Sequence, residues 1–178
     1  MQKATIFLGF LLASLCCFAQ NKTPSADEVL TPVYAQAAKE NKKVLLIFHA
    51  SWCGWCRKMD ASLQDVSVKP LIDNNYITAH LTVYESRDKK ELENPGALEL
   101  LTEHGGAGKG LPYWLVLDKE GKVLANSLFQ PNENSGCPAS EEEVAYFISV
   151  LRKTSSLNNE QLKIIEKRFR MNDRTAAN

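Results

Sequence analysis

The stretch "FHASWCGWCRKMD", residues 48–60, places two cysteines with two residues between them where an apolar run gives way to a charged one. The run before the cysteines, "VLLIF" at 44–48, does not alternate between apolar and polar residues, which is typical of a strand buried on both faces of a sheet. After them, "CRKMDASLQD" spaces Met59 and Leu63 for one face of a helix. We therefore expect a buried strand followed by a helix that begins at about Cys53.

This position makes Cys53 and Cys56 a candidate redox couple. The unpaired backbone N–H groups at a helix start, together with the positive end of the helix dipole, stabilise a thiolate, which is the reactive form of cysteine. Cys53 is therefore the candidate nucleophile. Cys56, one turn deeper, would be shielded from solvent and could resolve a mixed disulfide formed on Cys53.

Two other interpretations of the cysteine pair stay open at this point. A zinc site would need two further ligands, and none of the candidates has a paired spacing: His49, His80, His104 and Cys137. A purely structural disulfide would stabilise the fold little, because it closes so short a loop. The redox couple is preferred, and we assign no metal and no bound cofactor.

The N-terminus has the pattern of a signal peptide. An apolar run at 6–18 follows a basic start and ends at Ala19, and the run is too short to span a membrane stably. We predict a signal peptide over 1–19, cleaved near Ala19, and a periplasmic or secreted protein. Lipid attachment at Cys16 or Cys17 is less favoured, because the bulky Leu15 precedes the first of them.

Charge and cysteine count exclude several classes of function. The chain has 21 basic and 21 acidic residues, so no excess charge favours a polyanionic partner, and we expect no nucleic acid binding. An odd number of cysteines remains after residue 19, which argues against a framework of stapling disulfides. We expect a monomer.

The rest of the chain predicts an α/β sandwich of one domain. Capping boxes at Ser25 with Glu28 and at Ser140 with Glu143 mark two helix starts, and Gly121 marks a hairpin turn. Further elements are expected as a strand at 76–84, a short helix at 97–104, strands at 112–118 and 122–129, and a last helix at 159–171. The order of elements indicates a mixed sheet with helices on both faces.

These features resemble the thioredoxin superfamily, and within it the exported bacterial thioredoxin-like thiol:disulfide oxidoreductases. The similarity rests on "WCGWC" after a buried strand and on the later "GLPYWLVLD". It covers 27–153, after a loose segment at 20–26 and before a C-terminal helix and tail at 154–178. It implies a thioredoxin-like three-layer sandwich with a central mixed β-sheet, an insertion at 85–110 before a cis-proline, and an extra C-terminal helix.

The resemblance also implies a substrate-binding site. Cys53 and Cys56 would be catalytic, and Pro112 stands where the family has its cis-proline. A cis bond after Leu111 would present the backbone of that residue to an extended substrate segment, which binds as an added strand. Trp52, before the first cysteine, matches the family as well.

The three tryptophans leave two interpretations open. Trp52, Trp55 and Trp114 could form an aromatic rim around the sulfurs that receives unfolded substrates. Alternatively, one or two of them cover the core. We take Trp52 and Trp55, with Leu111 and Pro112, as the candidate substrate-binding residues.

One departure from the family concerns proton transfer. The family commonly has a buried acid six positions before the nucleophile, and this chain has Ile47 there. His80 stands at a place that is often a lysine paired with that acid, and unperturbed histidine has a pKa near 6.5. His80 is therefore the candidate proton acceptor, although an ordinary packed histidine would explain it equally.

The resemblance implies a reductase of protein disulfides that receives electrons from a membrane thiol donor. Isomerase or oxidase activity, and a peptide-binding module without turnover, are the alternatives. The residues between the cysteines, Gly54 and Trp55, differ from the Gly-Pro typical of reductases, so the direction is not settled by motif. Cys137 has no base near it in sequence, and we expect no catalytic role for it.

Overall fold

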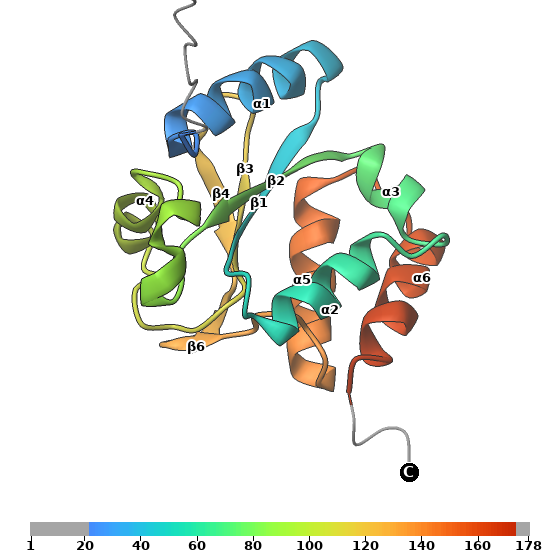
Figure 1. Cartoon of the computed structure of the whole chain (residues 1–178). Helices are drawn as coiled ribbons and strands as arrows, with labels where there is room; N and C mark the ends of the chain where they lie inside the picture. Colours follow the sequence, from blue (N-terminus) through green and yellow to red (C-terminus); the bar gives the residue numbers. More distant parts are fainter. Residues whose placement is uncertain (1–21, 174–178) are drawn as a thin grey trace, which may run out of the picture.

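The computed structural model of the chain describes residues 22–173, and the predicted signal peptide at 1–19 lies outside that range (Figure 1). Four strands form the central sheet in the order β2 (Tyr76–Thr82), β1 (Lys43–His49), β3 (Tyr113–Leu117) and β4 (Val123–Asn126). β1 pairs with β2 in parallel and with β3 in antiparallel orientation. The predicted mixed sheet is therefore confirmed.

The central strand β1 supplies both faces of the sheet with core residues. Leu45 and Ile47 belong to one apolar cluster, whereas Val44, Leu46 and Phe48 belong to the other. All five side chains are inaccessible to solvent. A strand with no polar face can be stable only when both sides are covered, so β1 requires a three-layer architecture.

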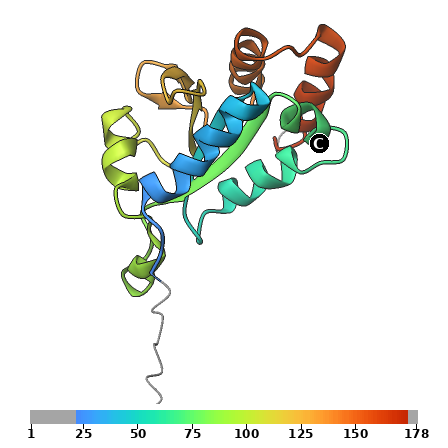
Figure 2. The same cartoon turned by 90° about the horizontal axis from the view of Figure 1, so that it is seen from above.

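Helices cover the two faces unequally (Figures 1 and 2). On one face lie α1 (Ala26–Glu40) and α4 (Ala97–Glu103), preceded along the chain by the short 3₁₀ helix η1 (Arg87–Leu92). The other face carries α2 (Gly54–Leu63), α3 (Lys69–Asp73), α5 (Glu141–Thr154) and α6 (Asn159–Arg170). None of the helices between residues 22 and 173 combines the length and apolar character that a membrane span requires.

Local signals place the helix ends. The predicted capping boxes are confirmed: Ser25 and Glu28 exchange hydrogen bonds at the start of α1, and Ser140 and Glu143 do so at the start of α5. α1 ends at Asn41, which takes the left-handed conformation that asparagine tolerates. α1 turns Leu30 and Ala37 into the core, whereas Ala38 is exposed.

The second half of the predicted hairpin is not one strand. "KVLANSLF" divides into β4 and β5 (Leu128–Gln130), and β5 pairs with β6 (Glu133–Asn134) in a separate small sheet. The break falls at buried Ser127, whose hydroxyl oxygen accepts the backbone N–H of Trp114 at 3.2 Å. The carboxamide oxygen of Asn126 also accepts the Leu128 N–H at 3.0 Å and turns the chain away from the sheet. The β5–β6 hairpin is thereby brought out beside the start of β3.

The last helix, α6, docks against α5 through apolar side chains. Leu162, Ile165 and Phe169 are buried, and the Phe169 ring lies 4.9 Å from that of Phe147 in α5. The helix therefore belongs to the core of this face.

We expect Phe169→Ala to lower the free energy of unfolding by about 3 to 5 kcal/mol, because it removes a fully buried ring and leaves a cavity. Guanidinium chloride denaturation followed by circular dichroism measures this change. Met171→Ala, at a side chain that is 71% exposed, should stay within about 0.5 kcal/mol of the unmodified protein. An equal effect of the two substitutions would contradict the docking of α6.

Candidate active site

The two cysteines lie where β1 has ended and α2 begins. Cys53 is the N-cap residue of α2, and its sulfur accepts the backbone N–H of Cys56 with an N–S distance of 3.1 Å. The two sulfurs are joined in a disulfide bond. The predicted helix start is confirmed, and the bond to Cys53 Sγ is the kind that stabilises a thiolate once the disulfide is reduced.

Both cysteines are shielded in this disulfide form. Cys53 is 3% exposed and Cys56 is 2% exposed, so the expectation that only the second would be covered is wrong for this state. Ala50 and the two cysteines form a small apolar cluster, and Leu111 packs against it. Exposure therefore does not distinguish the two sulfurs, whereas the hydrogen bond to Cys53 does.

Leu111 comes from the loop that leads into β3. The Leu111–Pro112 peptide bond is cis, and the next residue, Tyr113, pairs with Phe48 at the end of β1. This register carries the start of β3 to the sheet edge at which the cysteines lie. Pro112 and Leu111 are thus brought to the same end of the sheet as the disulfide.

Asn134 of β6 holds this loop from the other side. Its amide nitrogen donates to the carbonyl oxygens of Lys109, Gly110 and Pro112 at 3.1, 3.3 and 3.0 Å. Sequence reasoning missed Asn134, because nothing in its local pattern indicates a partner 22 to 25 residues earlier.

A pocket of about 300 Å³ opens beside Leu111. We call it the Trp55 pocket. Its lining combines apolar and polar side chains from α2, the loop before β3, the segment after β6, and α5, and includes Trp55, Lys109, Leu111, Asn134, Cys137 and Glu143. A concave site with a few polar groups next to a reactive disulfide is suited to binding part of a substrate.

The tryptophans divide between surface and core. Trp52 is 57% exposed and Trp55 is 45% exposed, so both are available at the surface beside the cysteines. Trp114 is inaccessible to solvent, packs against Phe147, and donates its indole N–H to the carbonyl of Gly136. Of the two interpretations left open, the core one applies to Trp114.

The loop before Cys53 is tied to the first residues of the predicted insertion. Glu85 is 4% exposed. Its carboxylate accepts both the backbone N–H and the hydroxyl of Ser51. The indole N–H of Trp52 donates to the Tyr84 carbonyl at 2.8 Å. Glu85 is a second residue that sequence reasoning missed. Burial works to raise its pKa, but the two bonds from Ser51 outweigh burial, and the pKa lies below the ordinary value.

His80 lies in a small polar cluster on the face of the sheet that α2 covers. Its Nε2 atom is 2.9 Å from Asp60 Oδ1, and its ring meets that of His49 edge-on at 5.2 Å. His80 also pairs in register with Ile47, whose side chain is fully buried. Burial, with the neighbouring His80, lowers the pKa of His49 and keeps that ring neutral at neutral pH.

No set of zinc ligands comes together in the part of the chain that the structure describes. His49 and His80 do come together, but across residues 22–173 no group of three or more His, Cys, Asp and Glu side chains is arranged to hold a metal ion. Cys137 is buried instead beside Asn172, with 3.4 Å between its sulfur and the amide nitrogen. Burial raises the pKa of the Cys137 thiol to about 12, so this thiol is protonated at neutral pH.

Comparison with known proteins shows which family the chain belongs to. A family model described as thioredoxin-like matches residues 30–119. Similar solved structures include a disulphide isomerase from Xylella fastidiosa Temecula1 (23% identity, 79% of this chain and 85% of that one, TM-score 0.48). They also include an oxidoreductase named DsbH (21%, 85% and 95%, TM-score 0.44) and a thioredoxin from Thermus thermophilus (20%, 74% and 85%, TM-score 0.44). A search of curated proteins found no significant match.

We expect Glu85→Gln to lower the free energy of unfolding at pH 7 by about 1 to 3 kcal/mol, because the hydrogen bonds from Ser51 lose their charged acceptor. The folded-state pKa of Glu85 is lowered, so its contribution is present above the ordinary value of 4.5 and is lost as the pH falls through the folded value. Urea denaturation of both proteins from pH 7 to pH 3 checks this.

The difference between the two proteins should therefore be largest at pH 7 and shrink toward pH 3. Glu91→Gln, on the exposed surface of η1, is the matched control. A difference that stayed constant over this pH range would show that the carboxylate charge of Glu85 is not what holds the loop.

Proposed function

Because the chain belongs to the thioredoxin-like family, we propose that it is an exported thiol:disulfide oxidoreductase that reduces disulfides of protein substrates through Cys53 and Cys56. The observation that carries the proposal is the position of Cys53 at the start of α2, where its sulfur accepts a backbone N–H. This bond favours the thiolate, which is the species that attacks a disulfide.

The reaction proceeds in two exchanges. The Cys53 thiolate attacks one sulfur of the substrate disulfide, forms a mixed disulfide, and releases the other substrate sulfur as a thiolate that takes up a proton. Cys56 then loses its proton and attacks Cys53 Sγ. The substrate leaves fully reduced, and the enzyme keeps the Cys53–Cys56 disulfide. A dithiol donor, which we propose is a membrane thiol protein, returns the two electrons and two protons.

The substrate polypeptide binds beside this disulfide. Leu111 packs against the cysteines, and the Trp55 pocket continues from it. Trp52 and Trp55 offer exposed rings on the α2 side. We assign Trp52, Trp55, Leu111 and Pro112 to substrate binding.

His80 is the proposed proton acceptor for Cys56. Asp60 lies one helical turn after Cys56 on α2, so the two residues share a face of the helix, and the Asp60 carboxylate contacts His80. Ile47 offers no acceptor, because its side chain is apolar. A neutral His80, oriented by Asp60, can therefore take the proton that an acid takes elsewhere in the family.

The direction of the reaction depends on how strongly the thiolate is stabilised. The donor that meets Cys53 Sγ is a neutral backbone N–H, which stabilises the thiolate less than a neighbouring cationic side chain would. A moderately stabilised thiolate favours reduction of substrates. A reduction potential near about −270 mV would agree with a reductase, and one near about −120 mV would indicate an oxidase.

The remaining proposals concern location and organisation. Residues 1–19 act as a signal peptide, so the protein works in the periplasm or after secretion. The thioredoxin-like domain spans 27–153 and is followed by the C-terminal helix and tail at 154–178. The protein acts as a monomer without nucleic acid or bound cofactor.

With dithiothreitol as the electron donor, Cys53→Ser should abolish reduction of insulin disulfides, because the attacking thiolate is removed. Cys56→Ser should also lose turnover, but it should accumulate a mixed disulfide with the substrate on Cys53, since the resolving thiol is missing. Turbidity measures turnover, and non-reducing gels with mass spectrometry measure the trapped species.

The two variants control each other, because each removes one sulfur of the same pair. Trapping by Cys53→Ser in place of Cys56→Ser would reverse the assigned roles. Peptide binding with no turnover by the unmodified protein would favour the module without catalysis.

His80→Asn should lower the single-turnover rate of substrate reduction by about tenfold or more at neutral pH, because the general base is lost. Stopped-flow tryptophan fluorescence at pH 7 measures both rates. His104→Asn is the matched control, and equal rates for His80→Asn and the unmodified enzyme would exclude His80 as the acceptor.

A further inference from the structure

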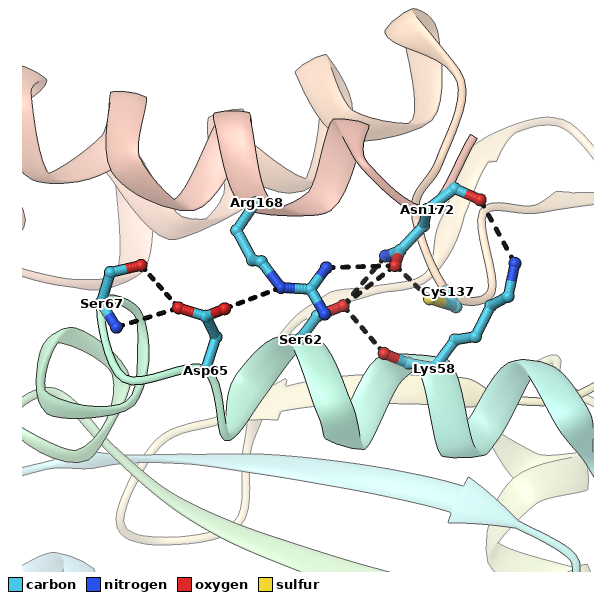
Figure 3. A network of polar contacts seen from close by, with 7 residues as sticks. All are labelled: Lys58, Ser62, Asp65, Ser67, Cys137, Arg168 and Asn172. Atoms are coloured by element: carbon cyan, nitrogen blue, oxygen red, sulfur yellow. Dashed lines mark hydrogen bonds and ion pairs between the residues drawn. The ribbon is translucent and has the colours of Figure 1, made fainter. Parts of the chain in front are cut away.

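The end of α6 is bound to α2 and to the segment after β6 by one buried amide (Figure 3). Asn172 is 6% exposed, and its amide nitrogen lies 3.0 Å from Ser62 Oγ, 3.4 Å from Cys137 Sγ and 3.3 Å from the Pro138 carbonyl oxygen. One side chain therefore joins α2, the segment 137–139 and the C-terminus of α6. Loss of this side chain would leave buried polar groups without their partner, which is costly.

Charged side chains fix the position of this amide. Arg168 donates to Asp65 Oδ2 at 3.0 Å and to Asn172 Oδ1 at 3.3 Å, as the dashed lines in Figure 3 show. Asp65 is held in turn by the backbone N–H and hydroxyl of Ser67. Arg170 donates to the carbonyl oxygen of Ala139. The last turn of α6 is thus fixed to both neighbouring elements.

Lys58 links Asn172 to Trp55 at the surface beside the cysteines. The Lys58 ammonium donates to the backbone carbonyl oxygen of Asn172 at 3.3 Å and lies 4.2 Å from the centroid of the Trp55 ring. An ammonium over an indole face is attracted to the ring and restrains it. The position of Trp55 therefore depends on the end of α6.

Trp55 and the segment 137–139 form two walls of the Trp55 pocket. Both walls are held by Asn172. Its side-chain amide contacts Cys137 and Pro138, and its backbone carbonyl, whose position that amide fixes, accepts the Lys58 ammonium that restrains Trp55. The third wall, at Leu111, is held separately by Asn134. Within residues 22–173 no hydrogen bond joins Asn172 to either sulfur of the disulfide, so Asn172 acts on the shape of the pocket and not on the sulfur exchange.

We propose that Asn172 is a positioning residue for substrate specificity. It holds Trp55 and the segment 137–139 as a preformed pocket that binds a side chain of the substrate polypeptide next to the disulfide under attack. This inference rests on the proposed oxidoreductase function and adds selectivity for polypeptide disulfides over small ones. Because preformed walls lower the entropy lost on binding, loosening them should weaken substrate binding and leave the sulfur exchange unchanged.

Asn172→Ala should raise the KM for insulin by about fivefold with little change in kcat. The same variant should keep the KM and kcat of the unmodified enzyme for bis(2-hydroxyethyl) disulfide, which has no side chain to place in the pocket. In the oxidised protein, iodoacetamide should label Cys137 about tenfold faster, because the amide that covers its sulfur is gone. Ile165→Val, a smaller change in the core of the same helix, should leave all of these values unchanged.

Lys58→Met gives a second measurement if Asn172→Ala does not fold. This substitution is on a half-buried surface position, keeps most of the length of the side chain, and removes the ammonium that links Asn172 to Trp55. It should raise the KM for insulin without accelerating the labelling of Cys137. If Lys58→Met keeps the unmodified KM for insulin, the proposed route to Trp55 is wrong.

The outcomes separate this inference from the function on which it rests. If the unmodified protein reduces insulin but Asn172→Ala keeps its KM, or loses activity on both disulfides equally, the inference is overturned and the oxidoreductase proposal stands. If the unmodified protein reduces neither disulfide, the oxidoreductase proposal fails and the specificity role fails with it.

Discussion

The hydrogen bond from the Cys56 N–H to the Cys53 sulfur is the contact on which the proposed chemistry of this protein depends. It exists because Cys53 is the N-cap of α2, four residues after β1 ends at His49. A backbone N–H at a helix start has no partner within the helix, so it is free to meet a side-chain acceptor. The fold therefore supplies a polar donor to a sulfur that is otherwise surrounded by apolar atoms.

Polar side chains hold the loops around this contact in place. Glu85 fixes the loop before Cys53, Asn134 fixes the loop before β3, and Asn172 fixes the segment after β6. Loops have few apolar contacts to define their position, whereas a buried carboxylate or amide is costly to leave without its partners. The walls around the disulfide are thus specified by hydrogen bonds, although the core beneath them is specified by apolar packing.

Ile47, six positions before Cys53, belongs to the apolar core and not to the polar cluster near the cysteines. Ile47 contributes to the apolar cluster under α2, and the polar groups His80, His49 and Asp60 lie together on the same side of the sheet. An apolar residue at 47 avoids the cost of burying a carboxylate in the core. The side chains of His80 and Asp60 are 33% and 42% exposed, so this pair remains open to solvent.

The amino-acid sequence by itself determined the elements and their layers, because those depend on local patterns. An apolar run without alternation predicts a strand covered on both faces, capping boxes predict helix starts, and the cysteine spacing locates the candidate couple. The roles assigned to these cysteines remain a proposal. Only the tertiary structure placed Trp114 in the core and turned the chain at Ser127 into a second hairpin.

The tertiary structure also decided how the site is supported. The contacts of Glu85 with Ser51 and of Asn172 with Ser62 join residues 34 and 110 positions apart, and no periodicity connects such positions in the sequence. Many residues along the chain carry donors or acceptors that could form a hydrogen bond with a given buried polar side chain. Which of them it meets is settled by the packing of helices and strands, since only the folded core brings one of them within hydrogen-bond distance.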